Sequence, residues 1–132
     1  MKPFTYLAFL LISISIFSQE KKPNILFIIS DDLTATAVSS YENKACHTPN
    51  IDKLASEGVR YTKAYTQYPV CGPSRASFLH GLYPQSTGVL DNKTDIRNVR
   101  PGTISIPQRF KESGYWTGGV GKVFHNEKFD HG

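Results

Sequence analysis

The segment VCGPSRASFLHGLYP, residues 70–84, places a cysteine before a proline and an arginine. Pro73 suits the first turn of a helix, so we expect a helix to begin there, directly after Cys71. The free N–H groups and the dipole of a helix amino terminus favour negative charge. Arg75 would lie in the first turn, where it is expected to fold back towards an anion near the thiol. A thiol in this setting is a nucleophile or a metal ligand.

A disulfide is the alternative for this cysteine. The chain has two cysteines, Cys46 and Cys71. An exported protein is exposed to oxidising conditions that let such a pair form a bridge. The residues alone leave this alternative open.

Two adjacent acids, Asp31 and Asp32, follow the apolar run ILFII of residues 25–29. In open α/β sheets, ligands bind beyond the carboxyl ends of the strands. Neighbouring carboxylates repel each other unless a positive charge lies between them. The pair therefore indicates a site for a hard cation such as Ca²⁺ or Mg²⁺, with helix capping by one acid as the alternative.

A lysine and a histidine occur together in GKVFH, after a glycine-rich turn. Lys122 and His125 can donate to a tetrahedral oxyanion, and a histidine can transfer a proton near neutral pH. Exposure to solvent is the alternative for both side chains. The remaining histidines, His47, His80 and His131, have no comparable setting and are interpreted as ordinary residues.

The elements expected to position these residues alternate between strand and helix. The β-branched run 25–29 predicts a strand buried on both faces. Further strands are expected at 59–66 and early in 115–125, and helices are expected at 48–58, 73–81 and 105–114, each with a proline in its first turn and a glycine at its end. Thr48 or Asn50 can cap the first helix and Ser105 the third, and Ala76, Leu79 and Leu82 can face the core from the second. Residues 85–103 are turn-rich and predict a long surface connection. This order predicts an α/β layered fold with an at least partly parallel sheet.

Composition and the first residues limit the class of protein. The net charge is +4 over 132 residues, with no long basic run, which gives no support for a nucleic-acid partner. Residues 1–18 have a basic start and a short apolar stretch interrupted by serines, which predicts a secretory signal peptide rather than a stable membrane span. We therefore expect an exported protein, periplasmic or secreted.

Taken together, these motifs resemble the sulfatase family. CGPSR is similar to the family signature C-x-P-S-R, and NILFIISDDL resembles the opening strand with its metal-binding acids. The segments TPNIDKLASEGVRYTKAY and SIPQRFKESGYWTGGVGKVFH resemble those before and after the signature. The stretches GKVFH, TGVLDN and TISIPQRFKESGY are most similar to the iduronate-2-sulfatase branch. The resemblance covers nearly all of residues 19–132.

The resemblance implies a fold, a cofactor and roles for six residues. The fold would be the alkaline-phosphatase-like α/β sandwich with a mostly parallel central sheet, with only its amino-terminal part present in residues 19–132. Cys71, converted to formylglycine by a sulfatase-maturing enzyme, would be the nucleophile and a metal ligand, and so unpaired with Cys46. Ca²⁺ would be bound by Asp31 and Asp32. The formylglycine hydrate would contact Arg75 and His125, and the sulfate of a sulfated carbohydrate would contact Lys122.

Two departures from the family pattern bear on these expectations. His80 stands where the family often has threonine, within Leu79-His80-Gly81. The second half of the family's site, including further metal ligands, is absent, so we expect the chain to be an amino-terminal fragment, inactive in isolation. Two alternatives to a sulfatase remain: a phosphonate or phosphodiester hydrolase of the same superfamily, and a fragment that binds a cation or a sugar without turnover.

Overall fold

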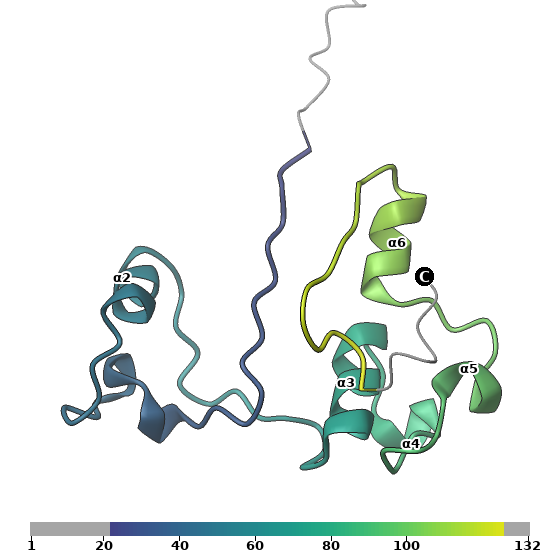
Figure 1. The fold of residues 1–132 in the computed structure, drawn as a ribbon, viewed down its shortest axis with the longest axis horizontal. Helices are drawn as coiled ribbons and strands as arrows, with labels where there is room; N and C mark the ends of the chain where they lie inside the picture. The colour runs from purple at the N-terminus through teal and green to yellow at the C-terminus, as the bar shows by residue number, and fades with distance from the viewer. Residues whose placement is uncertain (1–21, 126–132) are drawn as a thin grey trace, which may run out of the picture. The chain divides into compact units, whose positions relative to one another are not determined.

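The structure is a computed structural model that describes residues 22–125. The expected signal peptide, residues 1–18, lies outside the described residues. The chain divides between Gly58 and Val59 into two compact units, and each is described by itself. Figure 1 shows helices joined by long irregular segments.

Residues 22–58 of the amino-terminal unit contain one α-helix and two short 3₁₀ helices. These are η2 (Ala35–Ala37), η3 (Ser39–Tyr41) and α2 (Pro49–Glu57). Thr48 caps α2, with Pro49 in the first turn and Gly58 after the last residue, which confirms the expected helix and its bounds.

The start of α2 is bound to η3 by side chains. The hydroxyl of Ser39 donates to Asp52 at 2.5 Å, and the main-chain N–H of Ser39 donates to the Thr48 hydroxyl at 3.0 Å. Asp52 lies in the first turn of α2, where negative charge is favourable. The apolar side chains of α2 stay largely exposed, since Ile51 is 44% and Leu54 67% accessible.

The carboxy-terminal unit is built around α3 (Cys71–His80), which contacts α4 (Pro84–Thr87) and α6 (Ile106–Glu112). A further short helix, α5 (Ile96–Val99), lies between α4 and α6 along the chain. Ala76, Leu79 and Val89 form its small apolar core. Ala76 and Leu79 are thereby confirmed on the buried face of α3, whereas Leu82 is only half-buried.

The expected start of α3 and the expected connection at residues 85–103 need correction, whereas the third expected helix, α6, is confirmed. α3 begins at Cys71 rather than at Pro73, so the cysteine belongs to the helix. Residues 85–103 are not a plain surface connection, because they include most of α4, all of α5 and the buried residues Thr87 and Val89. Helix α6 has the expected cap, since the Ser105 hydroxyl accepts from the N–H of Gln108 at 3.3 Å.

The expected sheet is not confirmed, because residues 22–125 contain no β-strand. Residues 22–30 are irregular and exposed, and Leu26 is 84% accessible although its run predicted burial on both faces. The segments 59–66 and 115–125 are likewise without strands. A β-strand requires main-chain hydrogen bonds to a neighbouring strand, and an apolar pattern in the sequence does not by itself supply that neighbour.

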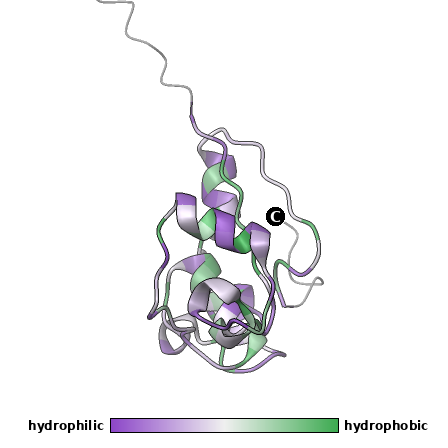
Figure 2. Cartoon of the chain, turned by 90° about the vertical axis from the view of Figure 1, so that its left-hand side faces the viewer, coloured by the Kyte–Doolittle hydropathy of each residue, from purple (hydrophilic) through white to green (hydrophobic). Residues whose placement is uncertain are grey.

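Apolar and polar residues alternate along the helical ribbons rather than forming a continuous apolar layer (Figure 2). Several large apolar side chains outside the small core are exposed, including Trp116 at 91% and Val120 at 100%. None of the helices within residues 22–125 has the length and apolar character needed to cross a membrane.

Candidate functional site

Cys71 is the first residue of α3 and is half-buried. The preceding residue, Val70, is extended, with φ −136° and ψ 138°, and caps the helix without a side-chain bond. Pro73 occupies the third helical position, where its missing N–H costs no hydrogen bond. Cys71 and Cys46 are both free cysteines in the structure.

The N–H groups of the first turn of α3 are largely occupied, contrary to expectation. Gly72 donates its N–H to the side-chain oxygen of Asn92 at 2.8 Å, and Ser74 donates to the carbonyl of Val70 at 3.0 Å. Pro73 has no N–H to offer. A negative charge near Cys71 would therefore be bound mainly by side chains rather than by the helix end.

The side chain of Arg75 reaches a segment far along the chain. Its side chain is buried, and its Nη1 donates to the carbonyl oxygens of Lys122 and, at 2.9 Å, of Val123. A buried guanidinium needs acceptors for its donors, and main-chain carbonyls supply them here. Arg75 thereby binds the GKVFH segment to α3.

This link brings three of the predicted site residues into one neighbourhood. Arg75 hydrogen-bonds the main-chain carbonyl of Lys122, and Lys122 is an exposed residue. His125 follows on the same segment and is half-buried. Its Nδ1 is enclosed and makes no hydrogen bond within the described residues.

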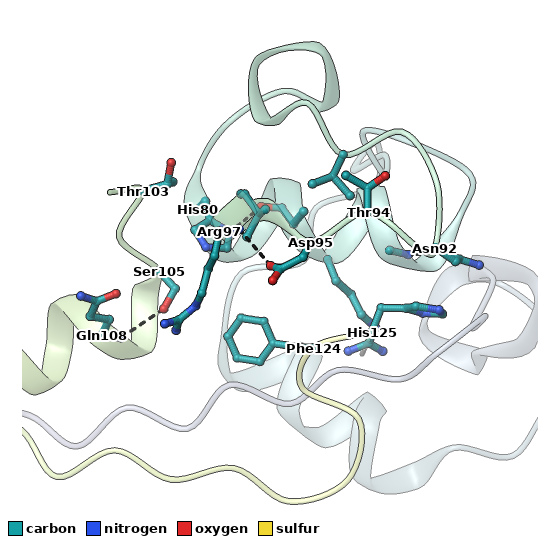
Figure 3. A pocket seen from close by; sticks show the side chains of 15 residues that line it. His80, Asn92, Thr94, Asp95, Arg97, Thr103, Ser105, Gln108, Phe124 and His125 are labelled. Carbon is teal, nitrogen blue, oxygen red and sulfur yellow. Dashed lines mark hydrogen bonds between the residues drawn. The ribbon is translucent and has the colours of Figure 1, made fainter. Parts of the chain in front are cut away.

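His125 lines a cavity of about 60 Å³, more than the roughly 10–15 Å³ that a single water needs. Figure 3 shows Phe124 between Ser105 and Gln108 on one side and Asn92 and His125 on the other. Arg75 and His80 also line this cavity. The Nδ1 of His80 lies 2.9 Å from the carbonyl oxygen of Ala76, one turn earlier in α3.

Asp31 and Asp32 belong to the other unit and lie on a turn after the irregular segment. Both are exposed, and Asp32 adopts a left-handed conformation with φ 59°. Two accessible carboxylates suit a hard cation, which takes six to eight oxygen ligands. Over residues 22–125, however, no group of three or more His, Cys, Asp or Glu side chains is arranged to bind a metal. The Ca²⁺ site therefore stays a prediction.

Contact of the loop at Asp91 and Asn92 with α3 was not predicted. Asp91 Oδ1 accepts from the N–H groups of Lys93 and Thr94, at 2.9 and 2.8 Å, and from the Thr94 hydroxyl at 2.7 Å. The hydroxyl bond and then the two N–H bonds hold the pKa of the Asp91 carboxyl below its usual value. The residues Asp-Asn favour a turn. The contact of this turn with Gly72 has no local sequence signal.

Comparison with known proteins places these features in a family. A family model described as sulfatase matches residues 23–130. The chain belongs to the sulfatase family.

Several proteins named as sulfatases are similar to the chain. It is 42% identical over 113 residues to a sulfatase of Formosa agariphila, a match that covers 80% of this chain and 22% of that protein. It is 50% identical over 103 residues to iduronate 2-sulfatase of Mus musculus, covering 77% of this chain and 18% of the relative. N-acetylglucosamine-6-O-sulfatase of Bacteroides thetaiotaomicron is 34% identical over 116 residues, covering 86% and 20%. The chain thus spans about a fifth of the length of these relatives.

Proposed function

We propose that the protein containing this chain hydrolyses sulfate esters of a sulfated sugar. The observation that carries the proposal is the position of Cys71 at the start of α3 in a CGPSR signature, with Arg75 of the same signature bound to the segment of Lys122 and His125. Membership of the sulfatase family supports the reaction class.

The nucleophile is residue 71 after conversion of its thiol to an aldehyde. A maturing enzyme oxidises the β-carbon of residue 71 by two electrons, which pass to that enzyme's own acceptor; the carbon–sulfur bond breaks, sulfur leaves as sulfide, and an oxygen atom from water takes its place. Water then adds to the aldehyde and gives residue 71 two hydroxyls. Sulfate esters react slowly, so a strong nucleophile and charge stabilisation are both needed.

Residue 71, Lys122 and His125 each have a separate role in hydrolysis. One hydroxyl of residue 71 attacks sulfur, and the bond between sulfur and the alcohol oxygen breaks as the alcohol leaves with a proton. Lys122 offsets the negative charge on the sulfate oxygens. His125 takes the proton of the second hydroxyl, the carbon–oxygen bond to sulfate breaks, and the aldehyde is restored.

Asp31 and Asp32 would bind Ca²⁺, together with residue 71 and further ligands from the longer protein. The ion would supply Lewis-acid polarisation of the sulfate group. Arg75 would contribute its charge to the residue 71 hydrate and also hold the segment of Lys122 and His125.

The substrate we favour is iduronate-2-sulfate in a glycosaminoglycan, because 50% identity to a mouse iduronate 2-sulfatase accompanies the sequence resemblance. Export to the periplasm or outside the cell, through the signal peptide, would give access to such a polysaccharide. A phosphonate or phosphodiester hydrolase is the alternative enzyme, and a binding fragment without turnover is the alternative for residues 19–132 in isolation.

The test uses the complete protein that contains this chain. Mass spectrometry of the peptide around residue 71 should show aldehyde in place of thiol, and an aryl sulfate should be turned over faster than an aryl phosphonate. Cys71→Ser should remain folded and lose activity to background, because serine lacks the second hydroxyl. Cys46→Ser, the same substitution at the other cysteine, should keep full activity.

An unmodified thiol at residue 71 in a fully active enzyme would overturn the mechanism. Faster turnover of the phosphonate would assign the alternative activity. The proposed sugar is tested by comparing the activity of the enzyme on iduronate-2-sulfated disaccharides with its activity on 6-O-sulfated N-acetylglucosamine, and the first should be higher.

A further inference from the structure

The first turn of α3 is held by a loop about twenty positions further along the chain. The N–H of Gly72 donates to Asn92 Oδ1 at 2.8 Å. The cap residue Val70 has no side-chain acceptor, so Asn92 takes the role that a capping serine or aspartate has in other helices.

The backbone of Gly72 approaches this loop too closely for a larger side chain. A Cβ on Gly72 would lie 2.8 Å from the carbonyl oxygen of Asp91 and 2.9 Å from Asn92 Oδ1. Gly72 itself is buried. The contact therefore consists of one hydrogen bond within a tight main-chain approach, and it leaves little freedom for either partner.

The loop that presents Asn92 is itself braced. The Asp91 carboxylate accepts three hydrogen bonds, from the N–H groups of Lys93 and Thr94 and from the Thr94 hydroxyl. Such an Asx turn restricts the backbone on both sides of Asn92. The acceptor for Gly72 is thus fixed by its own neighbours and does not depend on a flexible side chain alone.

The N–H of Gly72 and the carbonyl carbon of Cys71 belong to one planar peptide unit. Fixing the direction of that N–H therefore fixes the orientation of the peptide plane attached to the α-carbon of residue 71. In a reaction at this side chain, a displacement of about 1 Å costs up to roughly a hundredfold in rate.

We propose that Asn92 is a positioning residue for the nucleophile at residue 71, acting through the N–H of Gly72. This inference rests on the proposed function for its catalytic consequence, whereas the hydrogen bond itself can be tested without any activity. Asn92 touches neither the substrate nor the reacting atoms in this role.

The experiment compares three variants of the complete, matured protein. The aldehyde content of residue 71 is measured by mass spectrometry in each variant, and activities are expressed per aldehyde. Asn92→Ala removes the acceptor, and Asn92→Asp keeps an oxygen at the same place. Asn98→Ala is the matched control, because Asn98 is an exposed asparagine on α5 of the same unit.

Hydrogen exchange at the Gly72 amide is the first measurement. We expect exchange to accelerate at least about tenfold in Asn92→Ala and to stay slow in Asn92→Asp and Asn98→Ala, because only the first variant loses the acceptor. Unchanged exchange in Asn92→Ala would overturn the proposal. Should that variant not fold, Asn92→Gln replaces it, since its amide lies one methylene too far for the same bond.

Turnover of an aryl sulfate is the second measurement. We expect kcat to fall about tenfold in Asn92→Ala with KM changed less than about twofold, since substrate binding groups are untouched. Asn92→Asp should restore most of kcat. Equal kcat in all variants, with faster Gly72 exchange, would show that the bond is structural only and overturn the positioning role. An inactive wild-type protein with slow Gly72 exchange would instead refute the proposed function and leave the hydrogen bond established.

Discussion

Arg75 Nη1 donates a hydrogen bond of 2.9 Å to the carbonyl oxygen of Val123, which lies 48 residues further along the chain. The same nitrogen donates to the carbonyl oxygen of Lys122. Through this link, one arginine of the CGPSR signature holds the segment that carries Lys122 and His125. The signature arginine therefore has a structural role in addition to the electrostatic one proposed for it.

Removal of this arginine should cost both stability and activity. We expect Arg75→Ala to lower the free energy of unfolding by about 3 kcal/mol. The substitution removes a buried charged donor and leaves the carbonyl oxygens of Lys122 and Val123 without its hydrogen bonds. Arg75→Lys should recover little, since an ammonium cannot reproduce the planar donor group. Denaturant unfolding of the complete protein measures the loss, and sulfatase activity should fall towards that of Cys71→Ser.

Arg109→Ala is the control for that prediction. Arg109 is exposed and forms a surface ion pair with Glu112 at 3.3 Å. Its removal should cost less than about 1 kcal/mol. Equal losses for the two arginines would contradict the role assigned to Arg75.

Asp31→Asn should weaken the dependence of activity on Ca²⁺. The substitution removes one negative charge from the proposed ligand set, so the Ca²⁺ concentration for half-maximal activity should rise about tenfold. Titration of Ca²⁺ into chelator-treated protein measures this. Glu57→Gln, at an exposed acid of α2 that pairs with Lys53 at 3.9 Å, should leave the midpoint unchanged. An unaltered midpoint in Asp31→Asn would refute its role as a ligand.

The turn around Asp91 should contribute stability that depends on pH. Its folded pKa is lowered from 3.8, chiefly by the hydrogen bond from Thr94, so the charged form is favoured in the folded state. The stabilisation is present above the unfolded pKa and is lost as the pH falls through the lower, folded value. We expect the melting temperature of the wild type to exceed that of Asp91→Asn at pH 7, and this difference to shrink below pH 3.8. A difference that is independent of pH would argue against this carboxylate.

Ser105→Ala should destabilise α6. Ser105 is buried, and its hydroxyl accepts from the N–H of Gln108 at the start of the helix. Loss of an N-terminal cap costs about 1 kcal/mol. Ser113→Ala, which removes an exposed hydroxyl bonded to the Arg109 carbonyl, should cost distinctly less in the same urea titration. The reverse order of the two losses would mean that the cap contributes little.

Local signals predicted the helices well. Thr48 with Pro49 marked the start of α2, and Ser105 with Pro107 marked the start of α6, because capping and proline preferences act within a few residues. The start of α3 was misplaced by two residues, since Pro73 is accepted at the third helical position as well as at the first. The strand expected at 25–29 is not formed, because its apolar pattern predicts burial but cannot supply a hydrogen-bonding neighbour.

The sequence by itself determined the family, through the CGPSR signature and its flanking motifs, and it singled out Cys71, Arg75, Lys122 and His125. Only the tertiary structure decided that Arg75 binds the backbone at 122–123 and that Asn92 binds Gly72. Motifs are local in sequence because each residue type carries its own chemistry. Contacts between residues twenty or more positions apart depend on how the intervening chain turns, and a buried donor takes whichever acceptor that path brings within reach.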